Sequence, residues 1–224
     1  MNATLSQLVQ IPADAGFLEG ILELPPNARG VVLFAHGSGS SRLSPRNNFV
    51  AEKLREGHVG TLLVDLLLED EEAVYESRFD IPLLTRRLAT VAAWIAESRA
   101  ASDLPLGLFG ASTGAAAALR LAAAERASIA AVVSRGGRPD LAGAMALQNV
   151  HAPTQLIVGA EDHDVIELNR FAYDILRCEK RIQLVPGATH LFEEPGTLAR
   201  AALLARQWFE RHLCADAAAL AFVR

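Results

Sequence analysis

A serine set between two glycines is the first sign of chemistry in this sequence. Residues 110–114 read Gly-Ala-Ser-Thr-Gly, after a short apolar run and before an alanine-rich stretch. A G-x-S-x-G pentapeptide at a strand-to-helix junction predicts a strained turn that presents Ser112 as a nucleophile, at a helix N-terminus that favours developing negative charge. The pentapeptide alone fits equally well a glycine-bounded turn in which Ser112 only caps the helix, so other residues have to decide.

A serine hydroxyl needs a base, and the base needs an acid to orient it. In the order typical of this elbow, the acid and then the histidine follow the serine. Asp162 follows the apolar run 155–158, and His190 lies in a glycine-containing loop after the run 182–185. Asp162 could be a helix cap and His190 a structural histidine, but three matching placements favour a Ser112–His190–Asp162 triad. Asp164 remains the alternative acid.

A hydrolytic serine also requires backbone N–H groups that bind the oxyanion. Thr113, the residue after the nucleophile, supplies one. We expect Ser38, in the glycine-rich loop after the run 31–34, to supply the other. This loop, His36-Gly37-Ser38-Gly39, could instead hold a phosphate, but it lacks the GK[ST] ending and the third glycine of nucleotide-binding loops. We expect His36 to be structural and not a second base.

Short apolar runs alternate with segments of helical periodicity along most of the chain. The runs read as strands buried on both faces and lie at 31–34, 61–64, 106–109, 129–133, 155–158 and 182–185. The expected helices are 46–56, 81–99, 113–125, 139–147, 165–176 and 196–212. This alternation is the signature of right-handed βαβ crossovers in a doubly wound α/β domain.

An antiparallel hairpin is expected before the first crossover, because 8–11 and 17–24 flank the turn 14–16 and two prolines follow. We therefore predict an α/β fold with a mostly parallel sheet of about eight strands, helices on both faces and no cap domain. Residues 1–224 are expected to form a single domain, with the hairpin at about 6–24, the core at 30–213 and a short tail at 214–224. The acidic run 69–72 is expected to be a solvated loop or helix start.

The composition supports one such domain and argues against several other classes of protein. Of the 224 residues 51% are hydrophobic and 21% are charged, and the formal net charge is −5. A chain of this length hides roughly 70–75% of its unfolded surface, enough for one core without disulfides or a structural metal. The small negative charge disfavours a nucleic-acid or anionic-membrane partner.

Cysteine spacing and the first residues bear on the compartment. Cys178 and Cys214 have no CxxC spacing, so we expect reduced helix residues and no metal site. The N-terminal residues lack the basic start of a signal peptide, and no window holds eighteen uncharged apolar residues. The expectation is a cytoplasmic protein.

The motifs together resemble the α/β-hydrolase superfamily, and specifically its small dienelactone hydrolase-like branch. The resemblance covers residues 31–212 and rests on 36–39, 110–114, 159–165 and 187–190. Dienelactone hydrolases use cysteine as the nucleophile, so Ser112 makes this chain look more like a serine esterase, with no cofactor required. Segments 41–47 and 134–140 look like those of a bacterial subgroup whose members are often fused to or encoded beside phosphoribosyltransferase domains.

Two arginines are candidates for substrate binding. Arg135 follows the run 129–133, at the sheet edge that is expected to carry Ser112 and where open α/β sheets bind ligands. There Arg135, together with Arg42, would steer a carboxylate-bearing ester or lactone. Equally, these arginines could pair with local acids such as Asp140 or Asp65.

The sequence thus predicts a serine hydrolase that cleaves a small ester, thioester or lactone through an acyl-enzyme, as a monomer or homodimer. The alternative is a non-catalytic or accessory module that works with a phosphoribosyltransferase-type partner, against which the intact triad argues. A dinucleotide-dependent dehydrogenase is disfavoured by the missing glycine fingerprint. The short connection after 129–133 leaves no insertion for a helical lid, so we expect an open cleft.

Overall fold

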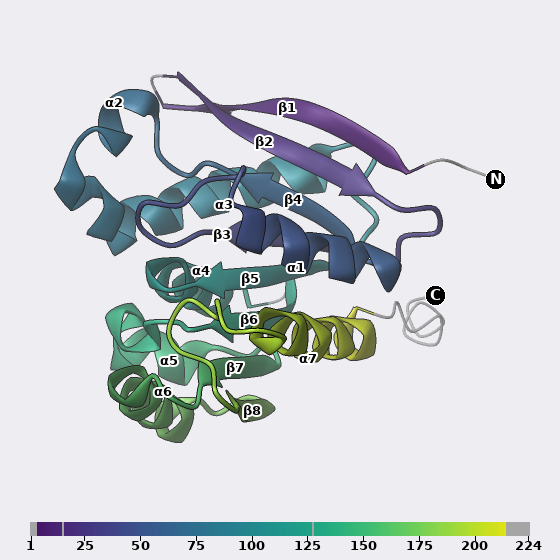
Figure 1. Cartoon of the computed structure of the whole chain (residues 1–224). Coiled ribbons are helices and arrows are strands. Elements are labelled where there is room, and N and C mark those ends of the chain that lie inside the picture. The colour runs from purple at the N-terminus through teal and green to yellow at the C-terminus, as the bar shows by residue number, and fades with distance from the viewer. Residues whose placement is uncertain (1–3, 15, 127, 214–224) are drawn as a thin grey trace, which may run out of the picture.

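The protein is built around a single β-sheet (Figure 1). The computed structural model describes residues 4–14, 16–126 and 128–213. The strand order is β1-β2-β4-β3-β5-β6-β7-β8. The strands are β1 (Leu5–Ala13), β2 (Gly16–Leu24), β3 (Val31–Ala35), β4 (Gly60–Val64), β5 (Leu106–Ala111), β6 (Ile129–Arg135), β7 (Thr154–Gly159) and β8 (Lys180–Val185).

The strand pairing confirms the predicted fold class. β1 pairs with β2 and β2 with β4 in antiparallel fashion, whereas all pairs from β4 through β3 to β8 are parallel. Every residue of β3, β4, β5 and β7 is buried, as expected for apolar strands covered on both faces. Parallel strands bring their carboxyl ends to one edge, and the loops at that edge carry the candidate site.

Helices cover both faces of this sheet (Figure 1). Core side chains of α1 and α7 pack on one face, and those of α3, α4, α5 and α6 belong to the core of the other face. The helices are α1 (Pro45–Glu56), α2 (Glu69–Glu72), α3 (Ile81–Glu97), α4 (Thr113–Ala124), α5 (Ala144–Asn149), α6 (His163–Ile175) and α7 (Thr197–His212), with 3₁₀ helices η1 (Tyr75–Phe79) and η2 (Pro139–Ala142).

Two expectations about local structure are wrong. The segment 139–147 is not one helix but η2 followed by α5, because Gly143 between them adopts φ +85°, which no α-helix accommodates. Cys178 is a free thiol, but it lies in the connection between α6 and β8 because α6 ends at Ile175. The proposed tail 214–224, with Cys214, lies outside the described residues, as does Ala15 of the hairpin turn.

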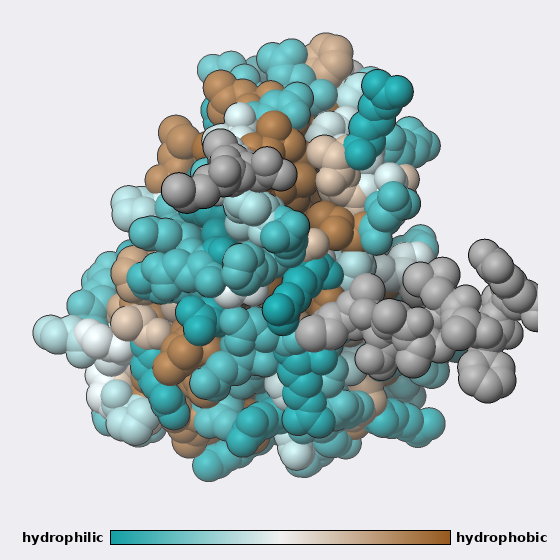
Figure 2. All heavy atoms as spheres, turned by 90° about the vertical axis from the view of Figure 1, so that its right-hand side faces the viewer, coloured by the Kyte–Doolittle hydropathy of each residue, from teal (hydrophilic) through white to brown (hydrophobic). Residues whose placement is uncertain are grey.

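Among the described residues, no cap interrupts the connection from β6 to β7. The segment from β6 to β7 is described throughout, and it holds only η2, α5 and short connections. The acidic run 69–72 forms the short helix α2. Figure 2 looks onto the end of the molecule where the parallel strands begin, and this surface is mostly hydrophilic, with hydrophobic side chains gathered in its upper part. No helix in the described chain has the length and apolarity to cross a membrane.

Candidate active site

Ser112 occupies a strained turn between β5 and α4. Its backbone has φ 49° and ψ −123°, a left-handed conformation that is costly for a residue with a side chain. The flanking glycines make the turn possible: a Cβ at Gly110 would overlap Ala115, and one at Gly114 would overlap the carbonyl oxygen of Ala35. The Arg138 N–H donates to the Ser112 carbonyl at 3.0 Å. This geometry has the features of a nucleophile elbow.

His190 and Asp162 meet at the carboxyl ends of β8 and β7. His190 Nδ1 donates to Asp162 Oδ2 at 2.7 Å, since an ionised carboxylate can only accept. The Asp162 side chain is 13% exposed and the His190 side chain 40%, so the carboxylate is shielded while the imidazole reaches the surface. Asp164, the other candidate acid, lies exposed in the first turn of α6. The geometry therefore favours Asp162 over Asp164.

Ser112 and His190 line the same cavity, which has a volume of about 220 Å³. In the described part of the chain, no hydrogen bond joins the Ser112 hydroxyl to the imidazole of His190. Catalytic hydrogen bonds often become short only in the substrate complex, so the lack of this bond without substrate is compatible with general-base catalysis. The structure thus brings together the three residues whose spacing predicted a triad.

The two expected oxyanion donors also lie together. The Ser38 backbone N–H donates to the Thr113 hydroxyl oxygen at 3.2 Å. Thr113 is the first residue of α4, where a helix leaves its N–H groups without partners in the helix. The contact with the Thr113 side chain was missed at the level of sequence, and an oxyanion would have to replace that hydroxyl as the acceptor for Ser38.

Arg42 does not reach this cavity. It forms ion pairs with Asp65 and Glu19, and these three side chains line a neighbouring cavity of about 520 Å³. Arg42 therefore forms the ion pair that was the alternative to substrate binding, and no geometry supports a role of Arg42 in steering the substrate. His36 lies beside the same acid: its Nε2 is 3.8 Å from Asp65 Oδ1, and its Nδ1 is 3.0 Å from the Gly37 carbonyl oxygen.

Arg135 is placed in the cavity of Ser112 and His190. It pairs with neither of the local acids considered above, because Asp140 accepts from Arg138 and Asp65 from Arg42. Sequence reasoning missed a further wall of this cavity, the start of α1 with Ser44, Arg46 and Asn47. The Ser44-Pro45 pair could have indicated this wall, because it is typical of a helix start and it follows shortly after the glycine-rich loop. Across the described residues, no group of three or more His, Cys, Asp or Glu is placed to hold a metal ion.

The sheet order, the elbow and the loops at the carboxyl edge define an α/β-hydrolase fold. The crystal structure of dienelactone hydrolase from Anabaena variabilis ATCC 29413 superimposes with a TM-score of 0.90, at 47% identity over 94% of this chain and 99% of that one. The chain belongs to this dienelactone hydrolase-like family of α/β hydrolases. Est1E from Butyrivibrio proteoclasticus shares the fold at 15% identity and a TM-score of 0.79, over 92% of this chain and 98% of that chain.

Relatives with a different name match the sequence as well. A protein of Mycobacterium tuberculosis that carries the provisional name phosphoribosyl transferase is 53% identical over 206 residues, which is 92% of this chain. The chain spans 46% of that relative, so more than half of its length has no counterpart here. No protein-family model matches the chain.

Proposed function

We propose that this protein is a carboxylic ester hydrolase that cleaves a small ester, thioester or lactone through an acyl-enzyme. One observation carries the proposal: Ser112 in its strained elbow lines the same cavity as His190, whose Nδ1 is held by Asp162 at 2.7 Å. The membership in a hydrolase family supports it. The residues from the hairpin to α7 act as one catalytic domain in this proposal.

In the first half-reaction the Ser112 hydroxyl attacks the substrate carbonyl while His190 Nε2 takes its proton. Asp162 fixes the tautomer that leaves Nε2 free to accept, and it stabilises the imidazolium that forms. The N–H groups of Thr113 and Ser38 bind the oxyanion. His190 then protonates the leaving alkoxide or thiolate, which leaves the acyl group on Ser112.

In the second half-reaction His190 takes a proton from water, and the hydroxide attacks the acyl-enzyme. The proton then returns from His190 to the Ser112 oxygen, and the acid product leaves. Water reaches the site directly in this proposal, because the residues that the structure describes form no cap over this edge of the sheet. The chemistry requires no metal or organic cofactor.

A series of p-nitrophenyl esters of increasing acyl length tests the proposal. We expect turnover that is highest for short acyl groups, because the cavity holds about 220 Å³, and that falls to background in Ser112→Ala. Turnover that persists in purified Ser112→Ala would contradict the proposed mechanism.

A second candidate follows from the relatives named as phosphoribosyl transferases. In it, the chain is an accessory α/β-hydrolase module, and the activity in their name belongs to the part of those relatives that this chain does not match. This candidate predicts no ester turnover and no reaction of Ser112 with a fluorophosphonate. Ester turnover, or reaction of Ser112 with a fluorophosphonate, would instead favour the hydrolase.

A further inference from the structure

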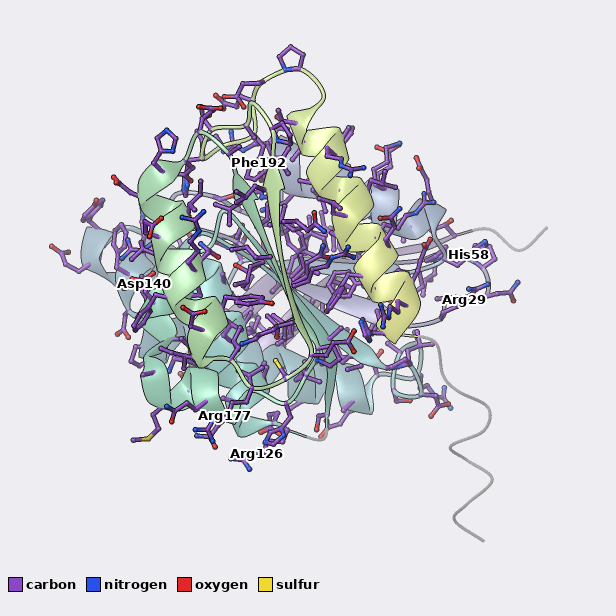
Figure 3. All side chains as sticks on the ribbon, turned by 90° about the horizontal axis from the view of Figure 1, so that it is seen from below. Arg29, His58, Arg126, Asp140, Arg177 and Phe192 are labelled. Carbon is purple, nitrogen blue, oxygen red and sulfur yellow. The ribbon has the colours of Figure 1, made fainter. Side chains whose placement is uncertain are left out.

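The cavity beside Ser112 contains a buried guanidinium that has no counter-ion among the described residues. Arg135 ends β6, in register with Ala111 of β5 and Ile157 of β7, and it is only 9% exposed. Its guanidinium carbon lies 5.9 Å from the ring centre of Phe109 and 5.8 Å from that of Phe192. Phe192 comes from the loop that leads to the start of α7 (Figure 3). Two aromatic rings thus border a cation that faces a substrate cavity.

The described residues offer the Arg135 guanidinium few interactions that compensate for the hydration it loses on burial. The Nε and Nη1 atoms of Arg135 are buried and have no hydrogen-bond partner among the residues that the structure describes. The acids around the site are committed elsewhere: Asp162 to His190 and Glu193 to Arg46. Cation–π contacts contribute only a small part of what a buried charge loses in hydration, so an unpaired guanidinium here is unfavourable in the free protein.

The rest of the cavity wall supplies no counter-charge for Arg135. None of its described lining residues is acidic, and the second guanidinium at the cavity, that of Arg46, is already paired with Glu193. Asn47 lies in the first turn of α1, where the helix dipole favours an anion, although the Asn47 N–H itself donates to the Ser44 hydroxyl. Burial, and then the charge of Arg46, lower the pKa of Arg135 to about 10, so the side chain remains a cation at neutral pH.

We propose that Arg135 is the anion-recognition residue of the cleft, and that the substrate is a small ester, thioester or lactone with a carboxylate or phosphate close to the scissile carbonyl. This inference rests on the proposed hydrolysis at Ser112. The anion supplies the counter-charge that Arg135 lacks, in a planar fork-to-oxyanion contact that an arginine makes well. The volume of about 220 Å³ limits the substrate to a small molecule.

Anion binding is tested first without any turnover. The thermal midpoint of the wild-type protein is measured with succinate or inorganic phosphate and compared with sodium chloride at equal ionic strength. We expect at least one of these anions to raise the midpoint of wild type and to leave Arg135→Met unchanged. Arg138→Met is the matched control, because Arg138 lies three residues further along and already pairs with Asp140; it should respond like wild type. Equal responses of wild type and Arg135→Met would overturn the proposal.

The same variant separates ligand binding from a structural role. If Arg135 serves a ligand, Arg135→Met removes an unpaired buried charge, and its midpoint in the absence of anions should equal or exceed that of wild type. A lower midpoint, with no loss of the anion response, would assign Arg135 to the stability of the fold and contradict the proposal. Arg135→Lys, which keeps the charge but loses the fork, should retain part of the anion response.

Kinetics then identify the anion and separate the two proposals. The substrates are p-nitrophenyl esters of matched size whose acyl group ends in a methyl ester, a carboxylate or a phosphonate. We expect wild type to prefer one anionic ester, and Arg135→Met to lose about 10²-fold in kcat/KM for it but less than about threefold for the neutral ester. The preferred acid distinguishes carboxylate from phosphate. Equal losses for all three esters would overturn anion recognition and leave hydrolysis standing, whereas anion binding without any turnover would overturn hydrolysis alone.

Discussion

His190 Nδ1 and Asp162 Oδ2 lie 2.7 Å apart, although the two residues are 28 positions apart in the chain. The contact joins the loop after β8 to the loop after β7, and it selects one imidazole tautomer. With Nδ1 engaged, only Nε2 can accept a proton, and His190 shares its cavity with Ser112. In the proposed mechanism the pair therefore makes His190 a base with a defined orientation, which is the role that a serine nucleophile requires.

The Asp162→Asn variant should lose most of its turnover. An amide at this position favours the wrong imidazole tautomer, and we expect kcat to fall about 10³- to 10⁴-fold with the fold intact. The measurement is the rate of hydrolysis of a short p-nitrophenyl ester, with circular dichroism to check the fold.

Asp164→Asn is the matched control for that variant. Asp164 is exposed on the first turn of α6, and its removal should change kcat less than about twofold, because only a weak helix-dipole interaction is lost. A loss confined to Asp164→Asn would transfer the role of acid to that residue.

Gly114→Ala should destabilise the protein. An added Cβ would overlap the backbone oxygens of Ala35 and His36, which cannot move without displacing the end of β3. We expect the free energy of unfolding to fall by about 3 kcal/mol, measured by urea denaturation. In Gly16→Ala, the new methyl would meet only the side chain of Leu68 at 3.3 Å, and the change should stay below about 1 kcal/mol. Similar losses in both variants would refute the packing explanation.

Arg42→Met should alter stability more than selectivity. Arg42 pairs with Asp65 and Glu19 beside a separate cavity, so its loss should lower the free energy of unfolding by about 1 kcal/mol. The ratio of kcat/KM for anionic and neutral esters should stay within about twofold of wild type. A collapse of that ratio would restore Arg42 as a substrate residue.

The preference for anionic esters should be lost at alkaline pH. Burial, followed by the charge of Arg46, lowers the pKa of Arg135 to about 10, so the cation is present below that pH and is lost as the pH rises through it. Because kcat/KM reports the free enzyme, the ratio for anionic over neutral esters should be constant from pH 7 to about 9 and fall above about 10. The ratio should be flat in Arg135→Met; a wild-type ratio that does not change up to pH 11 would speak against Arg135 as its source.

Local patterns in the sequence were sufficient to predict the fold and the sheet edge at which the candidate site residues lie. Strands such as β3 and β5 are apolar on both faces, which only a covered parallel sheet explains, and the carboxyl ends of parallel strands bring Ser112, Asp162 and His190 to one edge. The broken helix at Gly143 was missed because helical periodicity persists across a glycine whose positive φ is set by tertiary contacts.

The charges around the cleft could not be assigned from sequence, because ion pairing depends on distances between loops. Arg42 and Arg135 look alike as arginines near the sheet edge, yet one meets Asp65 and the other meets no acid among the described residues. The same limit applies to the contact from the Ser38 N–H to the Thr113 hydroxyl, which joins residues 75 positions apart. Such pairings follow from packing and not from spacing along the chain.

Covalent labelling of Ser112 would show whether this serine is the nucleophile. The wild-type protein is treated with a fluorophosphonate, and the adduct is located by intact-mass and peptide mass spectrometry. We expect one adduct, on Ser112, which is absent in Ser112→Ala and forms far more slowly in His190→Ala because the base is missing. A wild-type protein that takes up no label, or that carries it on a residue other than Ser112, would rule out Ser112 as the nucleophile.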